Sequence, residues 1–297
     1  MGIDRSTIRL IAKQTKNLNL RGSCITLGVH GIDGQYSDII NILNKESYKY
    51  YELGEKEIIY DDITHFGKTL HQDSFFKILG FSKVDSLDYF ENEKPTYVAD
   101  LNKPLRIDLY NKYDMVFDGG TIEHCFNVNE VLSNVIKLLK VGGLVVHHVP
   151  MTGWVEHGFY QFSPSLFYDF YGANGFDNLK AIIHQIGKKS YYIDYDPDLI
   201  SVFNNMKKVT MIFFIAQKMT ELMDIKEPIQ SIWLNKFAKN EGLIINNNKA
   251  INLKSHVKSF LLNVPQKNLS SLLMRIARSL NVLRKKIYFY THRIKLV

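Results

Sequence analysis

The stretch "YDMVFDGGTIEHCFNVNEVLSNVIKLLKVGG", residues 113–143, carries the clearest local signals in this chain of 297 residues. It begins with a mostly apolar run that ends in an aspartate and two glycines, which predicts a buried strand followed by a tight turn. Residues 127–140 place apolar side chains on one helical face, Asn127 can cap the start, and two glycines are expected to end the helix. A further apolar run at 144–150 predicts the next strand, so the stretch indicates a βαβ unit.

Other apolar runs on both sides of this unit also predict strands. They are "CITL" at 24–27, "KVDSL" at 83–87, "TYVADL" at 96–101, "LKAIIHQI" at 179–186 and "KKVTMIFFIAQK" at 207–218. Helical patterns alternate with the strands, so we predict an α/β fold with a Rossmann-like, mostly parallel, seven-stranded sheet and helices on both faces. Ligands bind such sheets beyond the carboxyl ends of the strands. Gly28, Asp88, Asp100 and Asp118 are expected at those ends.

The domain organisation follows from these elements. Residues 1–21 are predicted to be a helical lead-in, and residues 22–220 the α/β domain. The distance from Gly28 to Asp88 is long for one βαβ unit, so an insertion is expected near 35–70. Residues 221–297 are predicted to form a helical, basic extension. The two cysteines, far apart in the sequence, are expected to be reduced, buried thiols.

The 113–143 stretch, including the Glu123-His124 pair just after the strand, resembles class I S-adenosylmethionine (SAM) dependent methyltransferases. With the upstream strands the resemblance covers about residues 22–218. The segments "LGFSKVDSLDYF", "DGGTIEH" and "HGFYQFSPSLFY" more narrowly resemble methyltransferase-like proteins of bacterial surface-polysaccharide gene sets. The resemblance implies SAM as cofactor and a small-molecule or glycan acceptor.

The resemblance also implies which residues hold the cofactor. A carboxylate after the second strand accepts from the ribose hydroxyls, a role that fits Asp88, with Asp85 as the fallback. Asp100 suits the adenine amino group, with help from the backbone of Leu101. The full predicted set is Gly28, Val29, His30, Asp88, Asp100, Leu101, Asp118 and Gly119. The chain departs from the family in "LGVHGIDG", where His30 stands in place of the second glycine, so the SAM site is either remodelled or lost; we favour a remodelled site.

The segment "WVEHGFYQFSP" follows the fifth strand and is expected to overhang the methyl group. His157 is the candidate general base because imidazole titrates near neutral pH. Tyr160 is expected to orient the acceptor, and Glu123 and His124 complete the predicted catalytic set. No metal is expected. The adjacent His147 and His148 on the fifth strand should point to opposite sides of the sheet and cannot share an ion.

Charge is unevenly distributed along the chain. The formal net charge is +7, yet no Asp or Glu follows Glu241, and residues 242–297 hold eleven of the 37 Lys and Arg. Apolar residues in 273–294 recur at alternating steps of three and four, which predicts an amphipathic basic helix. Packing on the acidic body, self-association and binding to an anionic membrane surface through 268–297 all remain open. A homo-oligomer is one of these alternatives, and nucleic acid is a less favoured partner because no binding module is recognised.

Three hypotheses about function follow. The first is a SAM-dependent O-methyltransferase that acts on a sugar, a glycolipid or a surface-polysaccharide precursor. The second is a non-catalytic, methyltransferase-like binding or scaffold protein, suggested by the altered glycine loop. The third, suggested only by the basic tail, is an RNA methyltransferase. With no signal peptide pattern and no apolar run long enough to cross a bilayer, we expect a cytoplasmic protein, with the inner face of the membrane as an alternative site of attachment.

Overall fold

The structure is a computed structural model that describes residues 2–64, 67–187, 190–196, 208–222 and 224–231. The predicted basic tail, with its heptad pattern, therefore lies outside the described residues. Within them, none of the helices is long and apolar enough to span a membrane.

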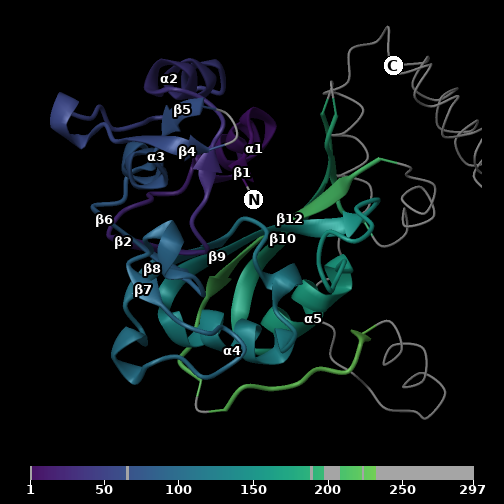
Figure 1. Cartoon of the computed structure of the whole chain (residues 1–297). Helices are drawn as coiled ribbons and strands as arrows, with labels where there is room; N and C mark the ends of the chain where they lie inside the picture. The colour runs from purple at the N-terminus through teal and green to yellow at the C-terminus, as the bar shows by residue number, and fades with distance from the viewer. Residues whose placement is uncertain (1, 65–66, 188–189, 197–207, 223, 232–297) are drawn as a thin grey trace, which may run out of the picture.

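A large sheet forms the centre of the fold (Figure 1). Its described strands are, in spatial order, β7 (Tyr97–Val98), β6 (Lys83–Asp88), β2 (Ser23–Leu27), β8 (Tyr113–Asp118), β9 (Leu139–Thr152), β12 (Thr210–Lys218), β10 (Phe176–Gln185) and β11 (Tyr191–Asp194). Neighbours from β7 to β9 are parallel, whereas β12 is antiparallel to both β9 and β10, and β11 is antiparallel to β10. The predicted α/β architecture is confirmed, but the described sheet has eight strands instead of seven and is mixed. Apolar runs locate strands but do not show their direction.

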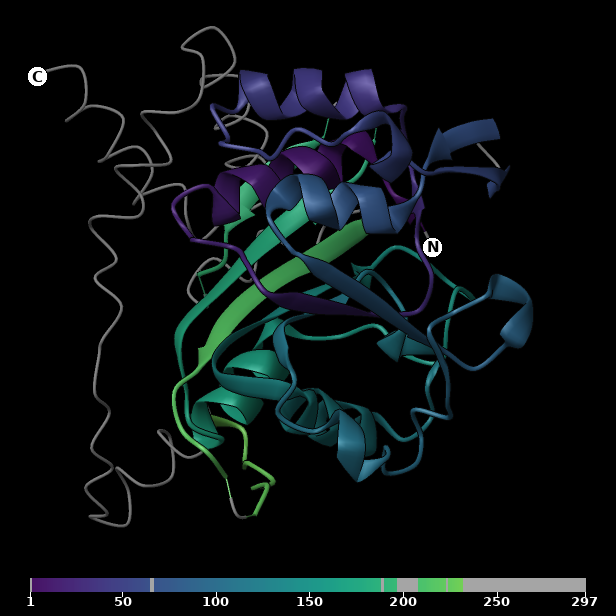
Figure 2. The same cartoon turned by 90° about the vertical axis from the view of Figure 1, so that its left-hand side faces the viewer.

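Helices cover both faces of this sheet, as predicted, and Figure 2 shows the sheet between the two layers. The first layer contains α1 (Arg5–Thr15), α2 (Tyr36–Lys45) and α3 (Gln72–Leu79). The second contains α4 (Val128–Leu138) and α5 (Pro164–Ala173). Each layer buries its own hydrophobic cluster against the sheet. The lead-in helix α1 belongs to the first cluster through Ile8 and Ile11, which are fully or almost fully buried.

Helix α4 ends earlier than the sequence predicted. Its last residue is Leu138, β9 begins at Leu139, and Gly142, with φ of 86°, lies inside that strand rather than in a helix-ending turn. The ammonium group of Lys218, buried at the end of β12, donates to the carbonyls of Ile136 (3.2 Å) and Leu139 (2.8 Å). A cation at these carbonyls satisfies acceptors that the helix itself leaves open.

The predicted insertion contains α2 and a hairpin of β4 (Tyr60–Thr64) and β5 (Gly67–Leu70). Two short strands, β1 (Gly2–Ile3) and β3 (Gly31–Ile32), pair in parallel beside it. The remaining elements are single 3₁₀ turns, η1 (Glu55–Glu57), η2 (Glu91–Glu93), η3 (Ile107–Leu109) and η4 (Ile122–His124). The last of these turns follows β8 and carries the Glu-His pair.

Candidate functional site

The carboxyl ends of β2 and β8 lie side by side, and the chain leaves them in opposite directions. From β2 it continues to β6 on one side, and from β8 it continues to β9 on the other. This is the switch point at which doubly wound sheets bind ligands. Gly28, with φ of 84°, donates its N–H to the carbonyl of Leu87 (2.7 Å). A Cβ on Gly28 would lie 2.7 Å from Thr121 Oγ1, so only glycine allows the two loops to approach this closely.

Asp88 connects the end of β6 to the loop after β2. Its Oδ2 accepts the N–H of Val29 (3.3 Å), and its Oδ1 accepts the N–H of Phe90 (3.0 Å). The side chain is half-buried, and each carboxylate oxygen retains a lone pair for a ligand. Asp85, the fallback, is buried and accepts from Tyr113 Oη (2.8 Å) and Lys83 Nζ (2.6 Å), so it faces the protein instead of the switch point.

Asp100 lies two residues beyond β7, next to the end of β6. Its Oδ1 accepts both N–H groups of Asn102, from the backbone and from the side chain, and its Oδ2 is 3.3 Å from Lys103 Nζ. The bonds from Asn102, followed by the interaction with Lys103, hold the pKa of Asp100 below its usual value. Leu101 is buried, and its carbonyl accepts from Asn134 Nδ2 (3.2 Å). Asp100 is thus ionised and partly exposed, while Leu101 packs in the core.

His30 fills the space between the loops after β2 and β8. The residue is 3% exposed, and its backbone N–H donates to Gln72 Oε1 (2.9 Å) at the start of α3. A Cβ on Gly119 would lie 3.0 Å from the imidazole Cε1 of His30, so the ring packs directly against that glycine. The chain therefore departs from the glycine-rich pattern in its structure as well as in its sequence. The imidazole of His30 fills the space that would be empty if this residue were a glycine.

Asp118 is fully buried and does not face a ligand. Its Oδ1 accepts the N–H groups of Gly120 (3.2 Å) and Thr121 (2.8 Å), and its Oδ2 is 2.7 Å from His147 Nδ1. Burial alone would raise the pKa of Asp118, but these bonds outweigh it and lower the pKa. We therefore correct the predicted cofactor contact: Asp118 shapes the turn after β8, and both of its oxygens are engaged within the protein.

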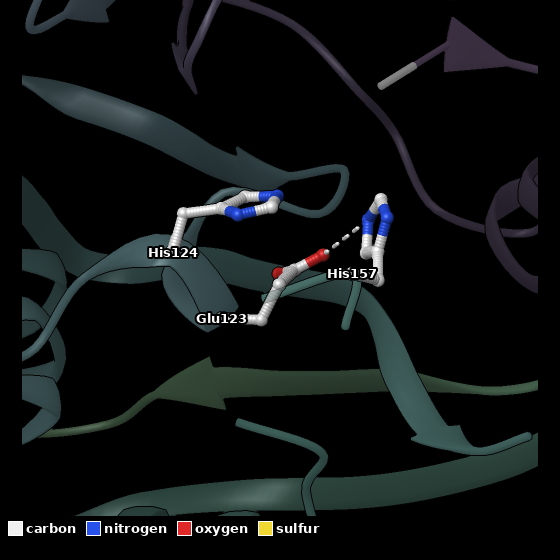
Figure 3. A group of neighbouring side chains, drawn as sticks. All are labelled: Glu123, His124 and His157. Carbon is white, nitrogen blue, oxygen red and sulfur yellow. Dashed lines mark ion pairs between the residues drawn. The ribbon is translucent and has the colours of Figure 1, made fainter. Parts of the chain in front are cut away.

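Glu123, His124 and His157 meet beside that turn (Figure 3). One donor atom from each lies within 4.8 Å of the others. Glu123 is 0% exposed, and within the part of the chain that the structure describes, neither carboxylate oxygen accepts a hydrogen bond. The imidazole nitrogen nearest to it is His157 Nε2, 3.7 Å from Glu123 Oε1, which is too long for a hydrogen bond. Three of the four predicted catalytic residues thus form a cluster with unused donor and acceptor atoms.

The surroundings of this cluster shift its pKa values. Burial, assisted by the negative charge of Asp118, raises the pKa of Glu123 to about 8. Burial lowers the pKa of His124 and of His157, so both rings are neutral near pH 7. The indole of Trp154 stacks on the His157 ring at 3.8 Å between centroids and fixes its plane. The sequence analysis did not single out Trp154 for this role.

Tyr160, predicted to orient an acceptor, instead supports the loop. Its N–H donates to the carbonyl of Glu123 (3.2 Å), and its hydroxyl donates to the carbonyl of Phe126 (2.9 Å). Beside it, the rings of Phe126 and Phe159 are 72% and 69% exposed, with centroids 6.0 Å apart. An exposed aromatic pair therefore borders the Glu123, His124 and His157 cluster.

The prediction that His147 and His148 point to opposite sides of the sheet is confirmed. His147 Nε2 bonds to Tyr171 Oη (2.6 Å) on the face covered by α5, and His148 Nε2 bonds to His184 Nδ1 (3.0 Å) on the other face. His184 Nε2 in turn lies 3.1 Å from Ser6 Oγ in α1. The sequence analysis missed these partners because they lie between 24 and 178 residues away.

No family model and no curated protein matches this chain. Among solved structures, it is similar to a phosphoethanolamine N-methyltransferase 2 of Haemonchus contortus in complex with phosphomonomethylethanolamine and S-adenosylhomocysteine. The identity is 13%, the match covers 72% of this chain and 53% of that chain, and the TM-score is 0.38. The match thus spans about half the length of that enzyme.

A second similar structure is a SAM-dependent methyltransferase from Archaeoglobus fulgidus, with 12% identity, coverage of 72% and 94%, and a TM-score of 0.40. Likenesses this distant carry no argument about activity.

Proposed function

We propose that this chain is a SAM-dependent methyltransferase that methylates a hydroxyl oxygen of a sugar, a glycolipid or a surface-polysaccharide precursor. The observation that carries the proposal is the position of Asp88, whose carboxylate lies at the switch point and reaches from the end of β6 to the glycine loop after β2. A carboxylate with spare lone pairs at this point fits a ribose diol.

Other residues near Asp88 fit the adenosine part of SAM. Tyr89 and Phe90 follow it directly, and both rings are more than half exposed, so they offer a surface on which a purine can stack. Asp100, ionised and partly exposed at the neighbouring strand end, suits an exocyclic amino group. Charge-assisted bonds of this kind contribute about 1.5–3 kcal/mol each.

The chemistry of the transfer asks little of the protein beyond alignment. Bound SAM would supply a methyl group on a sulfonium; the acceptor oxygen forms the new C–O bond, the S–C bond breaks, and its electron pair stays on sulfur. The hydroxyl proton leaves in the same reaction. Glu123 and His124 lie just after Thr121, whose Oγ1 is next to Gly28, and His157 joins them from the loop after β9. The two neutral imidazoles are suited to receive that proton, and Glu123 is suited to polarise the hydroxyl.

The proposed acceptor class rests on the exposed aromatic pair. Phe126 and Phe159 present open ring faces next to the cluster. Aromatic faces of this kind suit the apolar C–H face of a sugar ring, whereas a charged amine acceptor would need a carboxylate at the surface. The sugar proposal also draws on the resemblance of "HGFYQFSPSLFY" to polysaccharide-associated proteins.

Calorimetry with the full chain tests the cofactor. SAM and S-adenosylhomocysteine should bind with micromolar Kd, and Asp88→Asn should weaken both by about tenfold or more. The matched control is Asp108→Asn, an exposed carboxylate that pairs with Arg106 away from the switch point, and it should leave Kd unchanged. Absence of binding at millimolar ligand would rule out the enzyme.

One observation favours a second candidate, a non-catalytic binding protein. The buried His30 ring lies between Gly28 and Gly119, where the backbone of the family pattern is open. If the wild-type chain fails to bind SAM and His30→Gly restores binding, the histidine closes the site and the binding-protein hypothesis holds. If both bind, His30 belongs to a remodelled cofactor loop, as we propose.

A further inference from the structure

Glu123 has a buried carboxyl group whose two oxygens lack hydrogen-bond partners among the described residues. Its side chain is 0% exposed. A buried polar group without a partner costs about 1–3 kcal/mol, and more when it is charged. Such a group in a folded protein requires an explanation, and an ion that completes it is one.

The side-chain atoms that gather around the Glu123 carboxyl group are imidazole nitrogens, which can bind a metal ion. The rings of His124 and His157 pack edge to face with centroids 5.0 Å apart, and Figure 3 shows both rings next to the Glu123 carboxylate. The Nε2 atom of His157 is itself buried and has no hydrogen-bond partner in the described part of the chain. A carboxylate oxygen and two imidazole nitrogens are the donor set of many sites for divalent transition metals.

We propose that Glu123, His124 and His157 bind one divalent transition-metal ion of the Mn²⁺ to Zn²⁺ series. Two of the three ligands are imidazoles, which Mg²⁺ and Ca²⁺ accept poorly, so these ions should bind much more weakly. One unit of carboxylate charge and two neutral rings leave the bound ion with a net positive charge. Three protein ligands also leave at least one coordination position open.

The three donor atoms could reach the spacing of a metal site through movement of their side chains alone. The three donor atoms lie within 4.8 Å of one another, whereas donors in a tetrahedral site with bonds of about 2.1 Å are roughly 3.4 Å apart. His124 is exposed and can rotate toward the carboxylate. His157 is held in plane by Trp154, so one ring is fixed in advance and the other adjusts.

The role of the ion rests on the function proposed above, although its binding does not. Phe126 and Phe159, where the acceptor is proposed to lie, adjoin the three residues, so an ion held by them would have an acceptor hydroxyl within reach of its open position. A hydroxyl bound to the ion would be oriented and made more acidic, and its proton would pass to water. His157 then acts as a ligand and not as the general base that the sequence suggested.

The test uses the full-length chain without an affinity tag, stripped of metal with a chelator. Zn²⁺ is titrated by calorimetry, and Co²⁺ is titrated by its visible absorption, which reports imidazole coordination. We expect one equivalent of metal to bind. Glu123→Gln and His157→Gln should each weaken the Kd by about a hundredfold or more, which is at or above the upper end of the loss caused by removing a residue that only hydrogen-bonds to a metal ligand. Mg²⁺ should not displace Co²⁺.

The matched control is Glu156→Gln, an exposed glutamate adjacent to His157, which should bind Co²⁺ like the wild type. Equal Co²⁺ spectra and affinities in wild type, Glu123→Gln and Glu156→Gln would overturn the proposal, as would the absence of any binding at millimolar metal. Circular dichroism verifies that each variant is folded. SAM affinity is measured separately with chelator present, so failure of the cofactor site and failure of the metal site are distinguishable.

Discussion

Two acid–histidine groups lie five residues apart at the end of β8, and they differ in how their polar atoms are used. In the Asp118 network, formed by Asp118, His147 and Tyr171, the acid and the imidazole are 2.7 Å apart and the imidazole and the phenol 2.6 Å apart. In the Glu123 cluster, formed by Glu123, His124 and His157, the shortest acid–imidazole distance is 3.7 Å.

This difference indicates a structural role for the Asp118 network and a ligand-binding role for the Glu123 cluster. The Asp118 network is closed: its acid accepts from the backbone and from His147, and nothing in it is directed at solvent. The Glu123 cluster contains buried polar atoms without partners. Satisfied buried groups rigidify a fold, whereas unsatisfied ones mark a place for a ligand. Two substitutions in the Asp118 network and one in the Glu123 cluster test this contrast, and a change of pH tests a third buried group, the pair of His148 and His184.

Removing the acid of the closed network should have the largest effect. Asp118→Ala leaves His147 Nδ1 and the N–H of Thr121 buried without an acceptor. We expect the free energy of unfolding to fall by about 3–5 kcal/mol, as for other broken buried pairs. Urea unfolding measures this loss. A decrease below about 1 kcal/mol would show that the network contributes little to the fold.

Acid should destabilise the protein through the pair of His148 and His184. Burial lowers the pKa of His184 from 6.5 to about 4, and the negative charge of Asp4 opposes this only in part. The folded state thus binds fewer protons than the unfolded state, so stability is present above pH 6.5 and is lost as pH falls toward 4. The loss from His184 is about 3 kcal/mol.

Urea midpoints recorded across this pH range provide the measurement. His184→Gln keeps a polar partner for His148 but cannot titrate, so its stability should change less with pH than that of the wild type. Identical pH profiles for the two proteins would contradict the assignment to His184. Asp4 also loses stabilising interactions as the pH falls, because its pKa is lowered in the folded protein. Most of this contribution should remain in the variant, since bonds from Thr7 and Ser6 lower the pKa of Asp4 more than His184 does.

Removing one hydroxyl from the Asp118 network should have a smaller effect. Tyr171→Phe deletes the bond to His147 Nε2 but retains the ring, which packs against Phe214 and Phe176. We expect a loss of about 1–2 kcal/mol in thermal or urea unfolding, together with unchanged affinity for SAM and Co²⁺. A change in either affinity would mean that the network reaches the ligand site.

The smallest effect on stability is expected at the open cluster. Near pH 7, Glu123→Gln replaces a buried carboxyl group, kept neutral by its pKa of about 8, with a neutral amide of the same shape, so the metal-free chain should be about as stable as the wild type. The same substitution is expected to abolish tight metal binding. Clear destabilisation of the metal-free variant would place Glu123 among the structural residues, beside Asp118.

The sequence was informative where the local pattern determines the structure. The positions of Gly28 and Asp88 at strand ends were predicted because a strand that ends in glycine or aspartate has a local signature. The direction of β12 was not predicted because an apolar run is the same in both senses. The end of α4 was misplaced because it depends on Lys218, far along the chain.

In the candidate site, too, local sequence patterns identified individual residues but not the long-range contacts between them. Glu123, His124 and His157 were each predicted as catalytic from their positions after strands, but their meeting around one carboxyl group depends on a loop that carries His157, 34 residues after Glu123. The role of Asp118 was wrong because its partner His147 comes from a neighbouring strand. Long-range hydrogen bonds therefore decide which acid faces the ligand.

The place of β12 in the sheet has a consequence for how the protein is made. Because β12 lies between β9 and β10, both of those strands expose an apolar edge until residue 218 has been synthesised. At the usual speed of translation, the ribosome needs roughly 3 to 13 s to proceed from residue 152 to residue 218. During that interval the nascent chain is a substrate for chaperones, and messages truncated before Thr210 should yield aggregates instead of a shorter domain.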